Sequence, residues 1–230
     1  MKNYQFFSKV YDEIMGAEYQ AIYEGIIKKQ LKSKVIKNKL VLELGCGTGT
    51  IIRNLSMSNK TFGIDISPEM IKVARKKDKK TIYKTMDMAS FKLPCLFDIV
   101  FCAFDSINHI SGLSKWQKVF QSSRDHLKED GIFIFDFNTI EKFLTLNNKT
   151  LVRNSKNYYT IINTKATKNK CIWDISIFEK GKENNYKLYK ERIVEYSFPV
   201  DDVLKELGKV FGNAKIIKQD KNRIFIVAKK

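Results

Sequence analysis

Runs of apolar residues alternate with amphipathic segments along the first 140 residues of the chain. Strand-like apolar runs occupy residues 40–44, 61–65, 81–84, 96–104 and 131–138. Apolar residues spaced three or four apart predict helices between them and at the N-terminus, at residues 6–31 (with Gly16 between two helices), 51–55, 68–77 and 115–127. Nearly continuous apolar strands are typical of a parallel sheet covered on both faces. Their alternation with helices predicts a doubly wound, Rossmann-like α/β fold.

The pattern changes after Leu151. Residues 158–164, 171–178 and 186–197 are rich in β-branched and aromatic residues, and turn-like segments rather than helices separate them. They predict an antiparallel sheet inserted at 151–197. Residues 1–150 and 198–230 then form the α/β core, with an N-terminal helical cap, a helix near 200–210 and a closing hairpin at 214–218 and 224–228.

Three alternating glycines follow the first strand of the core. Gly45, Gly47 and Gly49 permit positive φ angles and close backbone approach, and the helix after them offers free amides to an anionic group. Glu43 is costly to bury in a strand, so we expect it near the strand's carboxyl end, facing a polar ligand. Asp65 ends the second strand, where an acid accepts hydrogen bonds from ribose hydroxyls; a solvated loop residue is the alternative.

The dinucleotide fingerprint G-x-G-x-x-G would need glycine where this chain has Thr50. The segment from Leu42 to Gly49 instead resembles the first motif of the class I S-adenosylmethionine-dependent methyltransferases. This resemblance implies a seven-stranded sheet with an antiparallel last strand, and S-adenosyl-L-methionine as cofactor. It also implies, residue by residue, the cofactor-binding set Tyr11, Glu43, Gly45, Cys46, Gly47, Gly49, Asp65, Ile66 (against the adenine), Asp87 (on its amino group), Met88 and Phe104. For Tyr11, core packing is the alternative.

The segment after the fourth strand bears on the chemistry. Residues 104–110 resemble small-molecule N-methyltransferases that act on glycine-like amines and amino sugars. The Asn/Asp-Pro-Pro-aromatic motif of nucleic-acid amino methyltransferases is absent here, and Pro94-Cys95 precedes the strand rather than following it. We expect Asp105 or His109 to accept the proton of an acceptor amine, directly or through water. A structural role is the alternative for His109.

Composition narrows the remaining choices. A chain of 230 residues that is 43% hydrophobic is large enough for a proper core, while the net charge of +17 permits nucleic acid, anionic membrane or phosphorylated partners. The positive charge is spread along a chain rich in Lys, Asn and Ile. A coding sequence rich in A and T would give this composition whatever the function, so the charge does not favour a nucleic-acid partner. The four scattered cysteines form no C-x-x-C pair and indicate no metal site or disulfide framework. No apolar run has a membrane-spanning length, which predicts a cytoplasmic protein.

The leading hypothesis is therefore direct methyl transfer from S-adenosyl-L-methionine to N or O of a small-molecule acceptor, by a monomer or homodimer. An RNA or protein methyltransferase is the first alternative, and a non-catalytic S-adenosylmethionine-binding protein is the second. The inserted sheet is expected to serve acceptor binding or dimerisation. Thr50 disfavours an NAD-dependent oxidoreductase.

Overall fold

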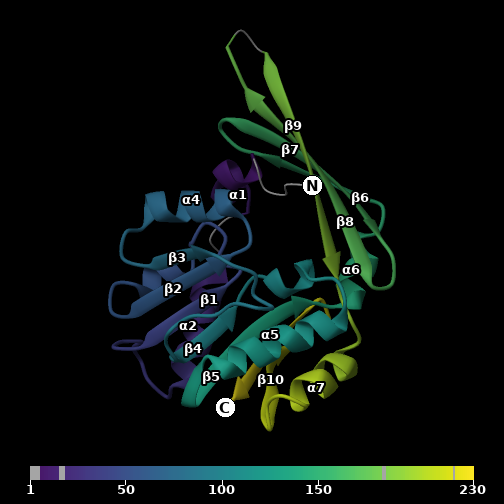
Figure 1. Cartoon of the computed structure of the whole chain (residues 1–230). Helices are drawn as coiled ribbons and strands as arrows, with labels where there is room; N and C mark the ends of the chain where they lie inside the picture. Colours follow the sequence, from purple (N-terminus) through teal and green to yellow (C-terminus); the bar gives the residue numbers. More distant parts are fainter. Residues whose placement is uncertain (1–5, 16–18, 183–184, 220) are drawn as a thin grey trace.

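The computed structural model describes residues 6–15, 19–182, 185–219 and 221–230, and these form two sheets (Figure 1). The larger sheet has seven strands in the order β10-β11-β5-β4-β1-β2-β3. Its strands are β1 (Leu40–Leu44), β2 (Lys60–Asp65), β3 (Ile82–Thr85), β4 (Phe97–Cys102), β5 (Leu127–Asn138), β10 (Asn213–Gln219) and β11 (Arg223–Lys229). Strands β1 to β5 run parallel and β11 runs antiparallel to β5, which confirms the predicted core fold.

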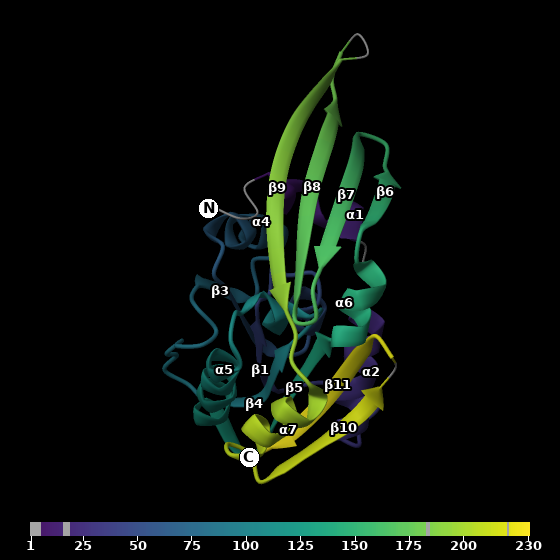
Figure 2. The ribbon, with the colours of Figure 1, turned by 90° about the vertical axis from the view of Figure 1, so that its right-hand side faces the viewer.

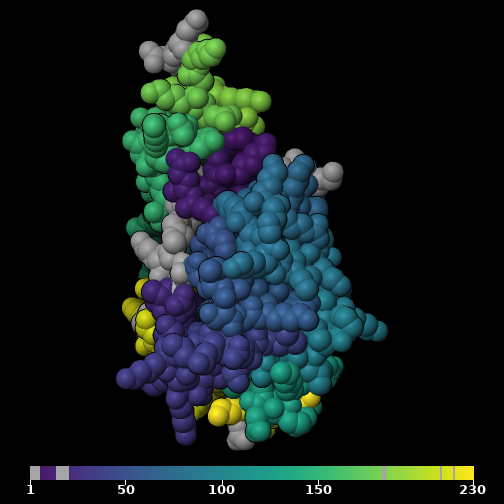
Figure 3. Space-filling model, turned by 90° about the vertical axis from the view of Figure 1, so that its left-hand side faces the viewer, coloured from purple at the N-terminus to yellow at the C-terminus, as the bar shows by residue number. Residues whose placement is uncertain are grey.

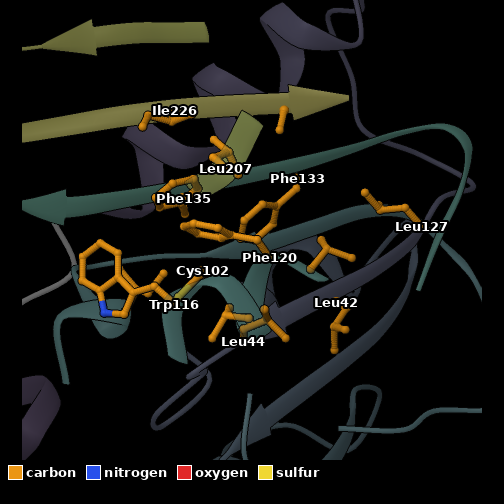
Figure 4. Close-up of a cluster of buried hydrophobic side chains, with 14 of the residues drawn as sticks. Leu42, Leu44, Cys102, Trp116, Phe120, Leu127, Phe133, Phe135, Leu207 and Ile226 are labelled. Carbon is orange, nitrogen blue, oxygen red and sulfur yellow. The ribbon is translucent and has the colours of Figure 1, made fainter. Parts of the chain in front are cut away.

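Helices cover both faces of this sheet, as the near-continuous apolar strands predict. One core cluster joins β4 and β5 to α5 (Leu113–Asp125) and α7 (Val200–Gly208), where Trp116, Phe120, Phe133 and Phe135 pack together (Figure 4). The other face packs on α2 (Tyr19–Gln30), α3 (Ile52–Leu55) and α4 (Pro68–Lys77). Side chains alternate between the two clusters along each strand, as Phe101 and Cys102 do on β4.

Local signals in the sequence place several elements correctly. Helix α4 begins at Pro68, and the Ser67 hydroxyl accepts a hydrogen bond from the Met70 amide, as an N-cap residue does. Strand β5 differs from the prediction because it starts at Leu127 rather than after a turn. The residues expected to form that turn instead belong to an irregular strand start, with Asp130 at a φ of 64°.

The inserted sheet has four antiparallel strands rather than the three that the sequence predicts. They are β6 (Lys149–Asn154), β7 (Tyr158–Ala166), β8 (Lys170–Lys180) and β9 (Tyr186–Tyr196), paired in that order. The additional strand β6 follows helix α6 (Ile140–Leu146), and most of its residues are exposed, so it carries no alternating apolar pattern. Figure 2 shows the four strands side by side, rising away from the core.

Helix α1 (Phe7–Met15) lies between the inserted sheet and α4 (Figure 3). Phe7 and Val10 pack on the inner face of the inserted sheet with Ile162, Ile175 and Ile193. The carboxylate of Glu191 on β9 accepts hydrogen bonds from the Phe6 and Phe7 amides, at 2.8 and 2.7 Å, and so caps the start of α1. The predicted break at Gly16 lies outside the described residues. No helix in the described part of the chain has the length and apolar character needed to cross a membrane.

Candidate active site

The glycine loop lies at the carboxyl end of β1, and its three glycines all have positive φ. The angles are 64° at Gly45, 52° at Gly47 and 77° at Gly49. A Cβ on Gly45 would lie 2.7 Å from the Ser106 Cβ, whereas a Cβ on Gly47 would meet nothing within 4 Å. The loop therefore packs tightly against the protein at Gly45 and is open at Gly47, where a ligand can approach the backbone.

Glu43 has a different surrounding from the one that its sequence position predicts. Its side chain is buried, and its carboxylate accepts a hydrogen bond of 3.1 Å from the Ile52 amide. Burial raises the pKa of Glu43, and the negative charge of Asp65 raises it further. The carboxyl thus ties β1 to the start of α3 beneath the loop, where we had expected it to face a polar ligand. Cys46 is also buried, and its side chain packs in the core below the loop.

Asp65 ends β2 next to this loop. Its two carboxylate oxygens accept hydrogen bonds from the Gly47 amide and the Ser67 amide, both at 2.8 Å. Burial raises the pKa of Asp65, while these amide hydrogen bonds lower it and offset part of the rise. The next residue, Ile66, is 71% exposed. An anchored acid and an exposed apolar side chain therefore stand together beside the open glycine.

Two other predicted cofactor residues follow β3. Asp87 is exposed, and its carboxylate accepts a hydrogen bond of 2.8 Å from the Ala89 amide. Met88 is half-buried and lies near both Gly45 and the Cys102 thiol. The structure thus places both residues along one side of the glycine loop.

Helix α1 brings Tyr11 over the site. Burial raises the pKa of the Tyr11 hydroxyl, and so do the charges of Asp105, Asp65, Asp12 and Glu195 in that order. The hydroxyl is therefore surrounded by carboxylates from four different segments. Asp12 accepts a hydrogen bond from the Thr48 hydroxyl, so α1 is attached directly to the glycine loop.

A buried ionic network lies behind the end of β4. Phe104 and Asp105 both adopt left-handed backbone angles, with φ of 57° and 51°. The Asp105 carboxylate accepts hydrogen bonds from Arg223 at 2.5 Å and from the Asn138 amide at 2.9 Å. Arg223 also pairs with Asp136 at 2.8 Å. Both oxygens of Asp105 are thus engaged with protein groups, which limits the proton-accepting role that we expected of it.

His109 lies at the end of a 3-10 turn, η1 (Ser106–His109), beside β9. Its side chain is exposed at the mouth of the site. Desolvation by the surrounding protein lowers the pKa of His109, while the charge of Asp65 and a backbone interaction with Val194 oppose this shift. A lowered pKa favours the neutral imidazole, which is the form that accepts a proton.

Glu195 is a further acid of this site that the sequence reasoning missed. It lies on the inner face of β9 and is 6% exposed, and its Oε2 has no hydrogen-bond partner among the described residues. Burial raises the pKa of Glu195 to about 8, and the charge of Asp105 contributes to the rise. The sequence does carry one indication of Glu195. In the alternating pattern of this strand it occupies an inward-facing position, two residues after Ile193 and two before Ser197.

Comparisons with known proteins agree with this geometry. A model of a methyltransferase domain matches residues 41–131. The crystal structure of an S-adenosylmethionine-dependent methyltransferase from Clostridium acetobutylicum superposes with a TM-score of 0.83 at 26% identity, over 98% of this chain and 98% of that chain. A sugar N-methyltransferase from Streptoalloteichus has the same fold, with a TM-score of 0.80 at 17% identity over 99% and 92% of the two chains.

Among curated proteins, dTDP-3-amino-3,6-dideoxy-alpha-D-glucopyranose N,N-dimethyltransferase of Streptomyces fradiae is 30% identical over 97 residues, which are 42% of this chain and 38% of the relative. The chain spans about half the length of the curated relatives that it matches. The matched domain contains the glycine loop and the acids that follow β2 and β3, and the full-length structural match includes the inserted sheet. The chain thus carries a methyltransferase domain at residues 41–131 and is similar over nearly its whole length to an S-adenosylmethionine-dependent methyltransferase.

Proposed function

We propose that this protein transfers a methyl group from S-adenosyl-L-methionine to an amine nitrogen of a small molecule. The observation that carries the proposal is the attachment of helix α1 to the site: Asp12 accepts a hydrogen bond from the Thr48 hydroxyl of the glycine loop, and the charges of Asp65 and Asp105 both raise the pKa of Tyr11. In this proposal the glycine loop and Asp65 bind the methyl donor, and the ionic network after β4 lies on the side of the methyl acceptor. The similarity to sugar N-methyltransferases supports an amino sugar as the acceptor.

The residues at the donor side fit an adenosyl group. Gly47 leaves space for a ligand against its backbone, and the anchored Asp65 carboxylate retains lone pairs for ribose hydroxyls. Ile66 offers an exposed apolar surface to the adenine, and in this proposal Asp87 and Met88, which follow β3, hold the base. In this proposal Glu43 and Cys46 support the loop from below, and Tyr11 and Phe104 close the methionine end.

The chemistry requires alignment more than a nucleophile from the protein. When bound, the cofactor would supply an electrophilic methyl group on its sulfonium. The acceptor nitrogen would attack that methyl carbon, with the thioether sulfur as the leaving group. Holding the two reactants in line contributes several kcal/mol, by the general effect of positioning. The proton lost by the acceptor amine leaves the site through water by way of His109, and Asp105 fixes the wall of the site through Arg223 and Asn138.

The same geometry bears on the kind of acceptor. Asp105, Asp136 and Glu195 are buried together, and such a cluster of acids favours a cationic amine at this side of the site. We therefore favour a small amine over RNA despite the net charge of +17. In this proposal the inserted sheet forms the acceptor wall, and the protein acts in the cytoplasm on a metabolite.

Incubation with methyl-labelled S-adenosyl-L-methionine and dTDP-3-amino-3,6-dideoxy-α-D-glucopyranose, followed by mass spectrometry, tests this function. We expect label on the amino sugar and none on its 3-hydroxy counterpart. The same incubation with a metabolite extract identifies other amines. Label recovered only in RNA or protein would contradict the proposal, as would binding of the cofactor with no transfer to any metabolite.

A further inference from the structure

Glu195 differs from Asp105 and Asp136, the two acids buried with it, because it has no cation of its own. Arg223 pairs with both Asp105 and Asp136, at 2.5 and 2.8 Å. In the described part of the chain, Glu195 forms no ion pair and its Oε2 accepts no hydrogen bond, although Asn138 and Trp173 lie close enough to lower its pKa. A buried carboxylate oxygen without a partner is costly unless a ligand completes it.

The position of Glu195 points this unsatisfied oxygen toward the reaction site. Side chains alternate along β9, so Glu195 shares the inner face with Ile193, which packs against Phe7 and Val10 of α1. The same strand contacts η1 through a 2.8 Å hydrogen bond from the Asn108 amide to the Tyr196 carbonyl. Glu195 also adds to the negative charge felt by the Tyr11 hydroxyl. The carboxyl therefore lies between α1 and η1, on the acceptor side.

Trp173 lies beside this carboxyl. Its Nε1 is buried and reaches no acceptor at full hydrogen-bond geometry among the described residues, yet as a donor toward Glu195 it lowers the pKa of that carboxyl. Trp173 and Cys171 lie on β8, where Cys171 pairs with Glu195 across the strands, so the indole is a diagonal neighbour on the inner face. An aromatic wall beside an acid is a common surrounding for a cationic amine.

We propose that Glu195 and Trp173 form an amine-binding subsite, in which the Glu195 carboxylate holds the acceptor's protonated amino group and takes one proton from it. This subsite rests on the proposed N-methyltransferase function. After the proton moves to Glu195, the nitrogen lone pair forms the N–C bond while the S–C bond breaks and its electrons stay on sulfur. The methylated product carries the positive charge that sulfur loses, and the Glu195 proton leaves to water with product release.

The charges around Glu195 suit this exchange of a proton. Burial raises its pKa to about 8, which is close to working pH and therefore favourable for a general base. Asp105, Asn138, Arg223 and Trp173 act on the charge of Glu195, and Glu195 in turn acts on Cys171 and Tyr11. Lys142 of α6 acts on Asp105 and Cys171. Arg223 is already shared by two carboxylates, so an incoming ammonium would give Glu195 a cation of its own.

Calorimetry in the presence of S-adenosyl-L-homocysteine tests the subsite directly. We expect the wild-type protein to bind dTDP-3-amino-3,6-dideoxy-α-D-glucopyranose more tightly than its 3-hydroxy counterpart. Glu195→Gln should reduce this preference about 10- to 100-fold, the size of one charge-assisted hydrogen bond. Glu179→Gln is the matched control, since Glu179 lies on the same sheet face and contacts Tyr189 at 2.8 Å. An unchanged preference in folded Glu195→Gln would overturn the subsite.

The donor's sulfonium is the other cation that Glu195 could face. Affinities for S-adenosyl-L-methionine and S-adenosyl-L-homocysteine distinguish the two, because only the first is a sulfonium. We expect both affinities to stay within about threefold of wild type in Glu195→Gln, since less than about 0.7 kcal/mol should change. Selective weakening of S-adenosyl-L-methionine would assign Glu195 to the donor and overturn the acceptor subsite.

If neither sugar nucleotide binds to the wild-type protein, the nucleotide-linked amino sugar fails as the acceptor, and the subsite is then judged with sugars that carry no nucleotide. The probe is glucosamine, with glucose as its uncharged match, and the readout is the carbon-13 resonance of the Glu195 carboxyl. A resonance whose titration glucosamine shifts and glucose does not would support an amine subsite. A resonance that neither sugar moves would overturn it.

Discussion

The Thr48 hydroxyl donates a hydrogen bond to the Asp12 carboxylate, which joins the glycine loop to helix α1. The second carboxylate oxygen of Asp12 contacts Lys77 Nζ of α4 at 2.5 Å. One side chain thus fastens the N-terminal helix to two elements of the donor site. Both contacts of Asp12 join residues that are far apart in the sequence.

Replacing Asp12 should loosen α1 over the donor. We expect Asp12→Ala to weaken S-adenosyl-L-homocysteine binding about three- to tenfold, because two partly exposed contacts are lost. Calorimetry measures the affinity, and Glu13→Ala, an exposed neighbour on the same helix, is the control. Equal weakening by both variants would contradict a specific role for Asp12.

Asp65 should matter more, because it both shapes the loop and lies beside the open Gly47. Asp65→Ala removes the acceptor for the Gly47 and Ser67 amides, and in our proposal also the ribose contact. We expect donor affinity to fall by about 2–3 kcal/mol, the cost of losing charge-assisted hydrogen bonds. Asp174→Ala, which breaks only a surface ion pair with Arg192, should leave the affinity unchanged. An Asp65 variant that binds the donor normally would show that the acid does not contact it.

The glycine loop should respond to a single added methyl group. Gly45→Ala places a Cβ 2.7 Å from the Ser106 Cβ at a φ of 64°, so we expect a loss of more than about 2 kcal/mol in unfolding free energy. Gly25→Ala is the matched control, since a Cβ there meets nothing within 4 Å inside α2. That variant should gain about 0.5–1 kcal/mol. Urea denaturation measures both, and a stable Gly45→Ala protein would contradict the close packing.

Stability should depend on pH through Glu195. The pKa of Glu195 is about 8 in the folded protein, against an ordinary value of 4.5 for a glutamate side chain, so the folded state binds more protons between these pH values. Stability from this group is therefore present below about pH 4.5 and is lost as pH rises toward 8. The unfolding free energy of Glu195→Gln minus that of the wild-type protein should accordingly be larger at pH 9 than at pH 5. A stability difference between Glu195→Gln and wild type that is the same at both pH values would refute the raised pKa.

The sequence predicts the donor side well because its signals are local. Gly45, Gly47 and Gly49 do adopt positive φ, and Ser67 does cap α4 at Pro68. Each of these features depends on residues only a few positions apart. The parallel strand order then brings the loop and Asp65 to one edge of the sheet, as the alternation of strands and helices predicts.

The acceptor side could not be predicted in the same way, because its partners come from distant segments. Arg223 contacts Asp105 across 118 residues of sequence, and no spacing rule joins a closing hairpin to the end of β4. Strand β6 is exposed along most of its length and so lacks an alternating pattern. Glu43 differs from its prediction for another reason. The sequence predicts that an acid in a strand is too costly to bury, but in the structure the buried Glu43 carboxylate accepts a hydrogen bond from the Ile52 amide.

The cap that Glu191 places on α1 connects the two halves of the reaction. The helix over the donor begins on amides held by a strand that, four residues further on, carries Glu195. Any displacement of that strand by an arriving acceptor would be transmitted to the helix, and reciprocity requires the donor to act back on the acceptor to the same extent. The two substrates should therefore bind cooperatively rather than independently.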